Sequence, residues 1–278
     1  MSAIGLPDAA TIRDKAHHEN FPVALRLLPA STRRHLIAFY CFARLVDDAG
    51  DEYAGDRLAA LDELDRDVTR VFTAGPRHPV LQTLQRSVRE LGLPQRPLRD
   101  LIEANRRDQR VTRYATFDEL LGYCALSANP VGRLVLHAFG AATPARARLS
   151  DLICSALQLI EHVQDVAEDH ARGRIYLPGA DLTRFGCTEE DLAAPSARGN
   201  LRALVAFECE RAERLLDLGV PLIRTLPWRQ ALAVAAYVAG GRAALAAIRR
   251  AGYDVLAHRP VPGRAGFARA LLATWRRR

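Results

Sequence analysis

The chain has 278 residues, with 39 lysines and arginines against 32 aspartates and glutamates, and a formal net charge of +7. Its hydrophobic share of 49% and charged share of 26% are typical of a globular protein and exclude a disordered or low-complexity chain. Lys15 is the single lysine, so the positive charge is almost all arginine, whose planar fork matches phosphate and carboxylate oxygens. The arginines are scattered without an aromatic stripe, which disfavours a nucleic-acid-binding module.

Other features of the sequence exclude several further classes of protein. No apolar run reaches the roughly 18 to 20 residues that span a bilayer, and residues 1–15 lack the pattern of a signal peptide. We therefore expect a cytoplasmic protein, whose basic and amphipathic C-terminal segment is a candidate for peripheral contact with the inner membrane. The five cysteines form no CxxC pair, which predicts reduced thiols and neither a zinc site nor a disulfide framework.

The periodicity of the sequence predicts helix after helix. Leucine, alanine and arginine dominate, and runs of alternating β-branched residues are missing. Segments with proline and glycine separate the helices at residues 75–79, 92–97, 143–144 and 221–227. No repeat and no shift in composition marks a boundary, so we expect a single all-α domain over residues 1–278.

Two predicted helices are apolar nearly all round and then become acidic. The first runs from about Ser31, a candidate N-cap, to Asp47, and the second runs from about Leu149 to Glu161 and beyond. A helix without a polar face is usually buried. Acidic residues that continue such a helix are therefore expected to face the interior or a cavity.

The first acidic cluster lies in the string YCFARLVDDAGD and contains Asp47, Asp48 and Asp51. At about 100° per residue, Asp47 and Asp51 share one helix face. Tyr40 and Arg44 project along the same stripe, and Asp48 lies at its edge. This spacing predicts two carboxylates, an arginine and a tyrosine on one surface.

The second acidic cluster lies in the string QLIEHVQDVAEDHARGR. Glu161, Asp165 and Asp169 follow each other at intervals of four residues, and Gln158 and Arg172 flank the same face. The helical spacing places the neighbouring histidines, 162 and 170, away from this face.

Carboxylates at this spacing repel each other, and the penalty grows beside a buried core unless cations compensate. Hard oxygen ligands suit Mg²⁺, which commonly bridges one or two carboxylates to substrate phosphates. We expect the two clusters to face each other across a cavity and to hold several Mg²⁺ ions and a diphosphate. The alternative is that each cluster is a solvated acidic turn with arginine partners. Residues 62–70 are equally acidic, but Arg66 and Arg70 interleave with the acidic residues there, so this stretch predicts an exposed amphipathic helix.

Both acidic strings resemble the aspartate-rich motifs of the squalene/phytoene synthase family. YCFARLVDDAGD is similar to the first motif and ALQLIEHVQDVAEDHARGRIYLP to the second, while residues 112–132 and 252–255 resemble two further family segments. The resemblance covers roughly residues 15–260 in family order. It implies an all-α isoprenoid-synthase helical bundle around a central apolar cavity. Members of the family join two farnesyl or geranylgeranyl diphosphates head to head.

The resemblance also implies roles for individual residues. The aspartates expected to bind Mg²⁺ and diphosphate are Asp47, Asp48, Asp51, Asp165 and Asp169. Diphosphate and substrate contacts are expected from Arg44, Arg172, Arg174, Tyr40 and Gln158. Tyr123 matches the family tyrosine that is implicated in proton handling near the departing diphosphate. Glu161 stands where most members carry a metal-binding asparagine, which leaves the occupancy of a third metal site open, and Gln164 replaces an arginine.

The string HHENFPVALRLLP, residues 17–29, departs from the family's usual start and resembles the hopanoid-pathway branch. That branch includes hydroxysqualene synthase, which converts presqualene diphosphate and water to hydroxysqualene and diphosphate. A separate synthase makes its substrate and a flavoenzyme consumes its product. Asn20 and Phe21 are then expected to contact substrate. Ser127 and Asn129 are candidates for placing the attacking water, or else they form a polar helix end before Pro130.

Two other functions stay open from sequence. The first is head-to-head condensation of two farnesyl diphosphates to presqualene diphosphate, squalene or a dehydrosqualene. The second is a non-catalytic assembly factor on the same fold, which the retained aspartates disfavour.

Overall fold

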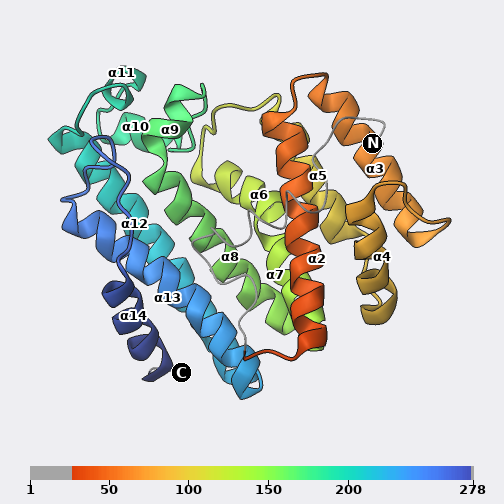
Figure 1. The fold of residues 1–278 in the computed structure, drawn as a ribbon. Coiled ribbons are helices and arrows are strands. Elements are labelled where there is room, and N and C mark those ends of the chain that lie inside the picture. Colours follow the sequence, from red (N-terminus) through yellow and green to blue (C-terminus); the bar gives the residue numbers. More distant parts are fainter. Residues whose placement is uncertain (1–26, 277–278) are drawn as a thin grey trace. The chain divides into compact units, whose positions relative to one another are not determined.

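The computed structural model describes residues 27–276, most of which lie in helices (Figure 1). Within that range no strand forms, and the one isolated β-bridge joins Arg113 to Ile175 in parallel. The prediction of an all-α protein is confirmed. The reason is the one that the sequence indicated, namely apolar residues at helical spacing with proline and glycine between them.

Two compact units divide the described residues. The first contains residues 27–110 and 126–147, and the second contains residues 111–125 and 148–276. The first unit is built from α2 (Ala30–Asp47), a π-helical turn (Asp48–Glu52), α3 (Arg57–Phe72), α4 (Pro79–Leu91), α5 (Arg96–Asp108) and α7 (Asn129–Ala138). Helices α6 (Phe117–Ser127) and α8 (Pro144–Gln164) run from one unit into the other. That residues 1–278 form a single domain stays a prediction.

The second unit contains short helices and long ones. The short helices are α9 (Val166–Ala171), α10 (Gly179–Arg184), α11 (Glu189–Leu192) and the 3₁₀ turn Val220–Thr225. The long helices are α12 (Gly199–Gly219), α13 (Trp228–Arg250) and α14 (Arg264–Arg276), of which α13 and α14 lie side by side (Figure 1).

Local signals set several helix ends. Helix α3 begins after Asp56, whose Oδ1 accepts a backbone N–H three residues on at 3.0 Å. Helix α4 begins after His78, whose Nδ1 accepts the N–H of Val80 at 3.2 Å, and ends at Gly92 with φ at 59°. The start of α2 differs from the prediction, because Ser31 lies inside the helix and Pro29 precedes it without a side-chain cap.

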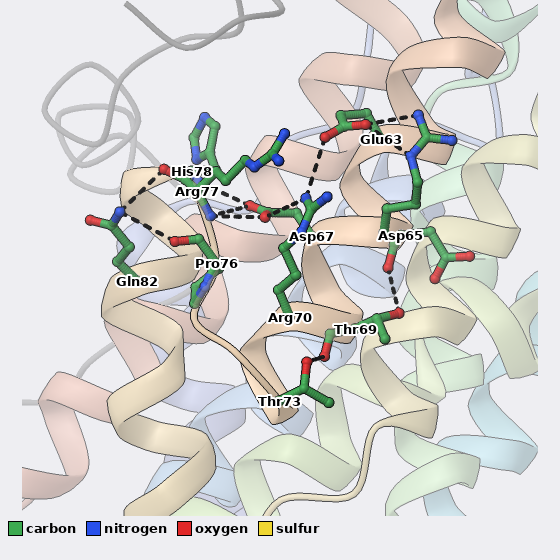
Figure 2. A network of polar contacts seen from close by, with 11 residues as sticks. Glu63, Asp65, Asp67, Thr69, Arg70, Thr73, Pro76, Arg77, His78 and Gln82 are labelled. Carbon is green, nitrogen blue, oxygen red and sulfur yellow. Dashed lines mark hydrogen bonds and ion pairs between the residues drawn. The ribbon is translucent and has the colours of Figure 1, made fainter.

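The acidic stretch of α3 combines exposed and buried carboxylates (Figure 2). Arg70 lies 3.2 Å from Asp67 and 3.5 Å from Glu63, which confirms the interleaving of arginines with acidic residues. Asp67, however, is only 3% exposed and accepts the backbone N–H groups of Arg77 and His78 at 2.8 Å each. The prediction of an exposed helix is therefore wrong at Asp67, because this carboxylate satisfies the loop between α3 and α4.

The helix that leads to the first cluster is buried, as predicted. The side chains of Phe42, Leu45 and Val46 are fully buried, and α2 packs against α4, α5 and α7 within the first unit. The last turn of α2 therefore delivers its acidic residues from the core of this unit.

Helix α8 is buried within the second unit by close contact with α12 and α13. A Cβ added to Gly219 would lie 2.9 Å from the carbonyl oxygen of Leu149, and one added to Gly241 would lie 2.8 Å from Leu157. Only glycine permits such close approach of two helices at these points. The buried helix α8 then holds the second cluster at its C-terminal end.

Among the described residues, one helix is long and apolar enough to cross a membrane by length and composition. It is α13, and most of it is buried inside the structure, as in the core helix of many globular proteins. The sequence analysis missed it because arginines interrupt its apolar runs.

Candidate functional site

The first acidic cluster follows α2 through the π-helical turn, which adds one residue per turn and changes the register of the side chains. Arg44 reaches Asp48, four residues on, and Glu52, eight residues on: its Nε lies 2.8 Å from Asp48 Oδ1, and its Nη2 donates to Glu52 Oε1 at 2.7 Å. Asp48 is 2% exposed. It is the buried partner of Arg44, which lies on the predicted stripe.

Asp47 has a different environment from Asp48. Its Oδ1 accepts a hydrogen bond from Asn105 Nδ2 of α5 at 3.2 Å, and its side chain remains open to solvent. Desolvation by neighbouring protein atoms raises the pKa of Asp47 to about 6, against the lowering effects of Asn105 and Arg44. The carboxylate of Asp47 is therefore accessible to solvent, and its negative charge is poorly compensated by neighbouring groups.

The remaining residues of the predicted stripe lie nearby. Asp51 is exposed, and its backbone carbonyl accepts a hydrogen bond from Arg57 Nη2 at 2.8 Å. Tyr40 is half-buried, one helical turn before Arg44. The structure therefore keeps all five predicted residues of this cluster on adjacent turns, although it distributes them over more than one face.

Sequence reasoning missed two residues that support this turn. Asn105 holds Asp47, and Gln109 donates to the carbonyl oxygen of Gly50 at 3.0 Å. A Cβ on Gly50 would overlap the Asn105 amide, so the glycine makes room for this support. Asn105 and Gln109 are one helical turn apart at the end of α5, whose other polar residues are charged, and this uncharged pair was the one available signal.

The second cluster lies where α8 ends and α9 begins. Asp165 separates the two helices, but the N–H of Asp165 still donates to the carbonyl of Glu161 at 2.9 Å, and that of Asp169 to the carbonyl of Asp165 at 2.8 Å. The predicted spacing of four residues is therefore kept across the break. Asp165 is paired with Arg259, whose Nη2 donates to Oδ2 at 3.0 Å. Arg259 was not among the predicted residues.

Asp169 is the most perturbed carboxylate of this cluster. Its side chain is 16% exposed. Burial and the neighbouring Asp165 raise the pKa of Asp169 to about 7, although Arg172 and Arg174 favour its charged form. The backbone carbonyl of Asp169 accepts the N–H of Arg174 at 2.8 Å, which keeps this arginine beside the carboxylate.

Four rings gather beside Asp169 within the second unit. Residues 112–115 lie alongside residues 175–180, and backbone hydrogen bonds join the two segments. One of them runs from the N–H of Ile175 to the carbonyl of Thr112 at 2.9 Å. The buried rings that result are those of Tyr114, Tyr123, His162 and Tyr176. The ring centroids of His162 and Tyr176 are 3.7 Å apart, and those of His162 and Tyr123 are 6.0 Å apart.

His162 contradicts its predicted orientation away from the aspartates. Its Nδ1 lies 4.0 Å from Asp169 Oδ2, and its Nε2 lies 3.3 Å from Gln158 Nε2. His162 and Asp169 are seven residues apart, which is close to two helical turns, and they remain on one side across the break at Asp165. The structure thus brings together Tyr123, Gln158 and Asp169 around a residue that the sequence analysis had set aside.

The remaining predicted site residues are placed as follows. Ser127 ends α6 and Asn129 begins α7, so the helix end before Pro130 is confirmed. Ser127 Oγ is buried and has no hydrogen-bond partner among residues 27–276, whereas Asn129 is 7% exposed and has a polar contact. Glu161 is half-buried. Asn20 and Phe21 lie outside the described residues.

The carboxylates of both clusters fit a hard divalent cation. Within residues 27–276, no three His, Cys, Asp or Glu side chains are already gathered as they would be in a formed metal site. Asp47 and Asp169 nevertheless have raised pKa values because burial penalises their charge, and a bound cation would relieve this penalty. Carboxylate oxygens are the ligands that Mg²⁺ prefers.

The fold defines the class of protein. The structure superimposes on that of squalene synthase HpnC from Alicyclobacillus acidocaldarius with a TM-score of 0.82 and 45% sequence identity, over 88% of this chain and 94% of that one. The fold is therefore that of the helical isoprenoid synthases. Residues 14–266 match the family model of squalene/phytoene synthase, and the chain belongs to the squalene/phytoene synthase family.

Two relatives with the names of different enzymes are similar to this chain to nearly the same degree. It is 35% identical to hydroxysqualene synthase of Rhodopseudomonas palustris, over 80% of this chain and 74% of that protein. It is 34% identical to phytoene synthase of Mycobacterium bovis, over 83% of this chain and 77% of that protein. The expected resemblance is confirmed, and the two relatives carry the names of different reactions.

Proposed function

We propose that the chain is a Mg²⁺-dependent enzyme that converts presqualene diphosphate and water to hydroxysqualene and diphosphate. In this reaction the carbon–oxygen bond to diphosphate breaks, a bond to the water oxygen forms, and one proton is released. The observation that carries the proposal is a set of under-compensated carboxylates, Asp47 and Asp169 above all, at the ends of two buried helices in a chain of this family. The hydroxysqualene synthase relative supports the choice of reaction.

The carboxylates proposed to hold Mg²⁺ are Asp47, Asp48, Asp51, Glu161, Asp165 and Asp169. When bound, Mg²⁺ supplies positive charge that stabilises the departing diphosphate. Arg44 holds Asp48 in place, and we assign it, with Arg172 and Arg174, a second role in donating charge-assisted hydrogen bonds to diphosphate oxygens. Tyr40 and Gln158 are assigned to the substrate, as are Asn20 and Phe21 by resemblance.

We assign Tyr123 to proton handling near the departing diphosphate, and Ser127 to placing the attacking water. Tyr123 is buried in the ring cluster beside His162, where its hydroxyl is shielded from bulk solvent. Ser127 Oγ is a buried polar atom without a partner among the described residues, and such an atom is suited to hold a water molecule. Asn129, at the start of α7, is the second candidate for orienting that water.

The proposed reaction places the chain within squalene and hopanoid biosynthesis. It requires a synthase that produces presqualene diphosphate and a flavoenzyme that consumes hydroxysqualene. We propose a cytoplasmic location, with peripheral membrane contact through the basic helix α14, since the hydrocarbon part of the substrate and the product are apolar.

The purified chain, incubated with Mg²⁺ and presqualene diphosphate, tests the proposal. We expect hydroxysqualene and one diphosphate per turnover, and no product after chelation with EDTA. A parallel incubation with farnesyl diphosphate is expected to give no product. If neither substrate is consumed, the enzymatic assignment is wrong, and a non-catalytic assembly factor on the same fold becomes the favoured function.

Head-to-head condensation is the second candidate function. The phytoene synthase relative, nearly as similar to this chain as the hydroxysqualene synthase, favours it. The same incubation separates the two reactions, because a condensing enzyme consumes farnesyl or geranylgeranyl diphosphate without added presqualene diphosphate.

A further inference from the structure

Two residues that follow α13 contact two residues at the end of α8. Arg259 engages both carboxylate oxygens of Asp165, with Nε donating to Oδ1 and Nη2 donating to Oδ2 at 3.0 Å. Directly beside this pair, Gln164 Nε2 donates to the carbonyl oxygen of Pro260 at 2.5 Å. Neighbouring residues on one segment thus bind neighbouring residues on the other, about 95 positions apart in sequence.

The burial of these groups indicates which contact fixes the other. Gln164 is 7% exposed and Pro260 is buried, so their hydrogen bond is shielded from water. The side chains of Arg259 and Asp165 are 35% and 24% exposed, and their ion pair faces solvent in part. A buried hydrogen bond to a backbone carbonyl sets the register of the segment, and the register places the guanidinium on the carboxylate.

The guanidinium of Arg259 and a metal ion compete for the same atoms. A carboxylate whose two oxygens accept a bidentate arginine has fewer lone pairs left for a divalent cation. The positive charge of the arginine also repels a cation that approaches Asp165. The pair therefore stabilises the protein without metal and opposes metal binding.

We propose that Arg259 is an internal counter-ion that occupies Asp165 until a metal displaces it, and that Gln164 is the positioning residue that holds Arg259 there. This inference rests on the proposed function, because it takes Asp165 as a metal ligand. The pair of contacts, called the Gln164–Arg259 clamp below, makes the metal affinity of the second cluster depend on a segment outside α8 and α9.

Binding of Mn²⁺ alone, measured by electron paramagnetic resonance, tests the clamp on the full chain. We expect Arg259→Gln to bind Mn²⁺ roughly tenfold more tightly than the wild type, since it removes one charge and both hydrogen bonds from Asp165. Gln164→Leu keeps every charge and removes only the bond to Pro260, and we expect it to bind roughly threefold more tightly. Amide hydrogen exchange of residues 256–263 is expected to be faster in Gln164→Leu.

Arg249→Gln is the matched control. Arg249 donates to Glu213 of α12 at 3.2 Å, and it contacts neither Asp165 nor Gln164. It makes the same change in net charge and should leave Mn²⁺ affinity unchanged. The clamp is overturned if Arg259→Gln binds Mn²⁺ no more tightly than the wild type, or if Arg249→Gln gives the same gain. Product formation by the wild type is measured separately, so an active enzyme whose variants show no gain in affinity keeps the proposed function and loses the clamp.

Discussion

His162 Nδ1 lies 4.0 Å from Asp169 Oδ2, at the junction of the ring cluster and the second acidic cluster. Burial lowers the pKa of His162 to about 3, so the imidazole is neutral at physiological pH. With Gln158 Nε2 donating to Nε2, the single ring proton is on Nδ1 and faces the carboxylate. A neutral histidine stacked on Tyr176 thus lies between a proposed substrate residue and a proposed metal ligand.

This relationship predicts the effect of replacing the imidazole by a ring without nitrogen. His162→Phe preserves stacking on Tyr176 and loses the contacts to Gln158 and Asp169. We expect kcat to fall about 10- to 100-fold, as is usual when a group that orients a metal ligand is removed. The measurement is product formation at saturating Mg²⁺, with the melting temperature checked in parallel.

His170→Asn serves as the control for this prediction, because His170 lies on α9 outside the ring cluster. It should retain the wild-type kcat. A wild-type kcat in His162→Phe would show that the histidine merely fills space.

The fold could be predicted from sequence because its determinants are local. Helical periodicity and the proline and glycine boundaries identify the helices, and the buried α2 and α8 appear as runs without a polar face. The acidic residues that continue those runs identified the candidate site, and the structure retains them at the helix ends.

The errors share a different cause, namely interactions between distant residues. The π-helical turn that follows α2 is not revealed by the periodicity of the sequence. Arg259 reaches Asp165 from far along the chain, and His162 lies beside Asp169 across the break between α8 and α9. Spacing along one helix contains no information on the contact between Arg259 and Asp165.

Metal binding is predicted to stabilise the protein in a manner that depends on Asp169. Its pKa of about 7 lies above the ordinary value, so its contribution to the stability of the metal-free protein is present below about pH 4 and is lost as the pH rises through 7. Mg²⁺ binds the charged form and should therefore raise the melting temperature more at pH 8 than at pH 6. Scanning calorimetry with Mg²⁺ or EDTA measures both differences.

Asp169→Asn should abolish most of this stabilisation and lower turnover at least about 100-fold. The matched control is Asp62→Asn, which alters an exposed carboxylate paired with Arg106 on the surface of the first unit. An undiminished Mg²⁺ effect in Asp169→Asn would remove Asp169 from the metal site.

Glu208 is predicted to make stability depend on pH without any metal. It is 4% exposed on α12, and burial raises its pKa to about 7 although Arg211 lies 3.1 Å away. A raised pKa means that its stabilising contribution is complete below about pH 4.5 and is lost as the pH rises through 7. Glu208→Gln should therefore increase the free energy of unfolding by about 1–3 kcal/mol at pH 8 and by much less at pH 5.

Urea unfolding at the two pH values measures this difference. Glu210→Gln on the same helix is the control, since Glu210 is exposed and should give the same small change at both. Equal effects of Glu208→Gln at pH 5 and pH 8 would show that burial does not hold a proton on this carboxyl group.

Asn105 is predicted to set the acidic limb of the activity profile. Its hydrogen bond at 3.2 Å favours the charged form of Asp47 and lowers a pKa that burial otherwise raises to about 6. Asn105→Leu removes this bond, so the pKa of Asp47 should rise further and the acidic limb of kcat/KM should move to higher pH by about 0.5 to 1 unit. Gln109→Met loses the neighbouring bond to the Gly50 carbonyl and leaves Asp47 untouched. A shift of the limb in Gln109→Met as large as that in Asn105→Leu would assign the effect to the π-helical turn as a whole and contradict a specific role of Asn105.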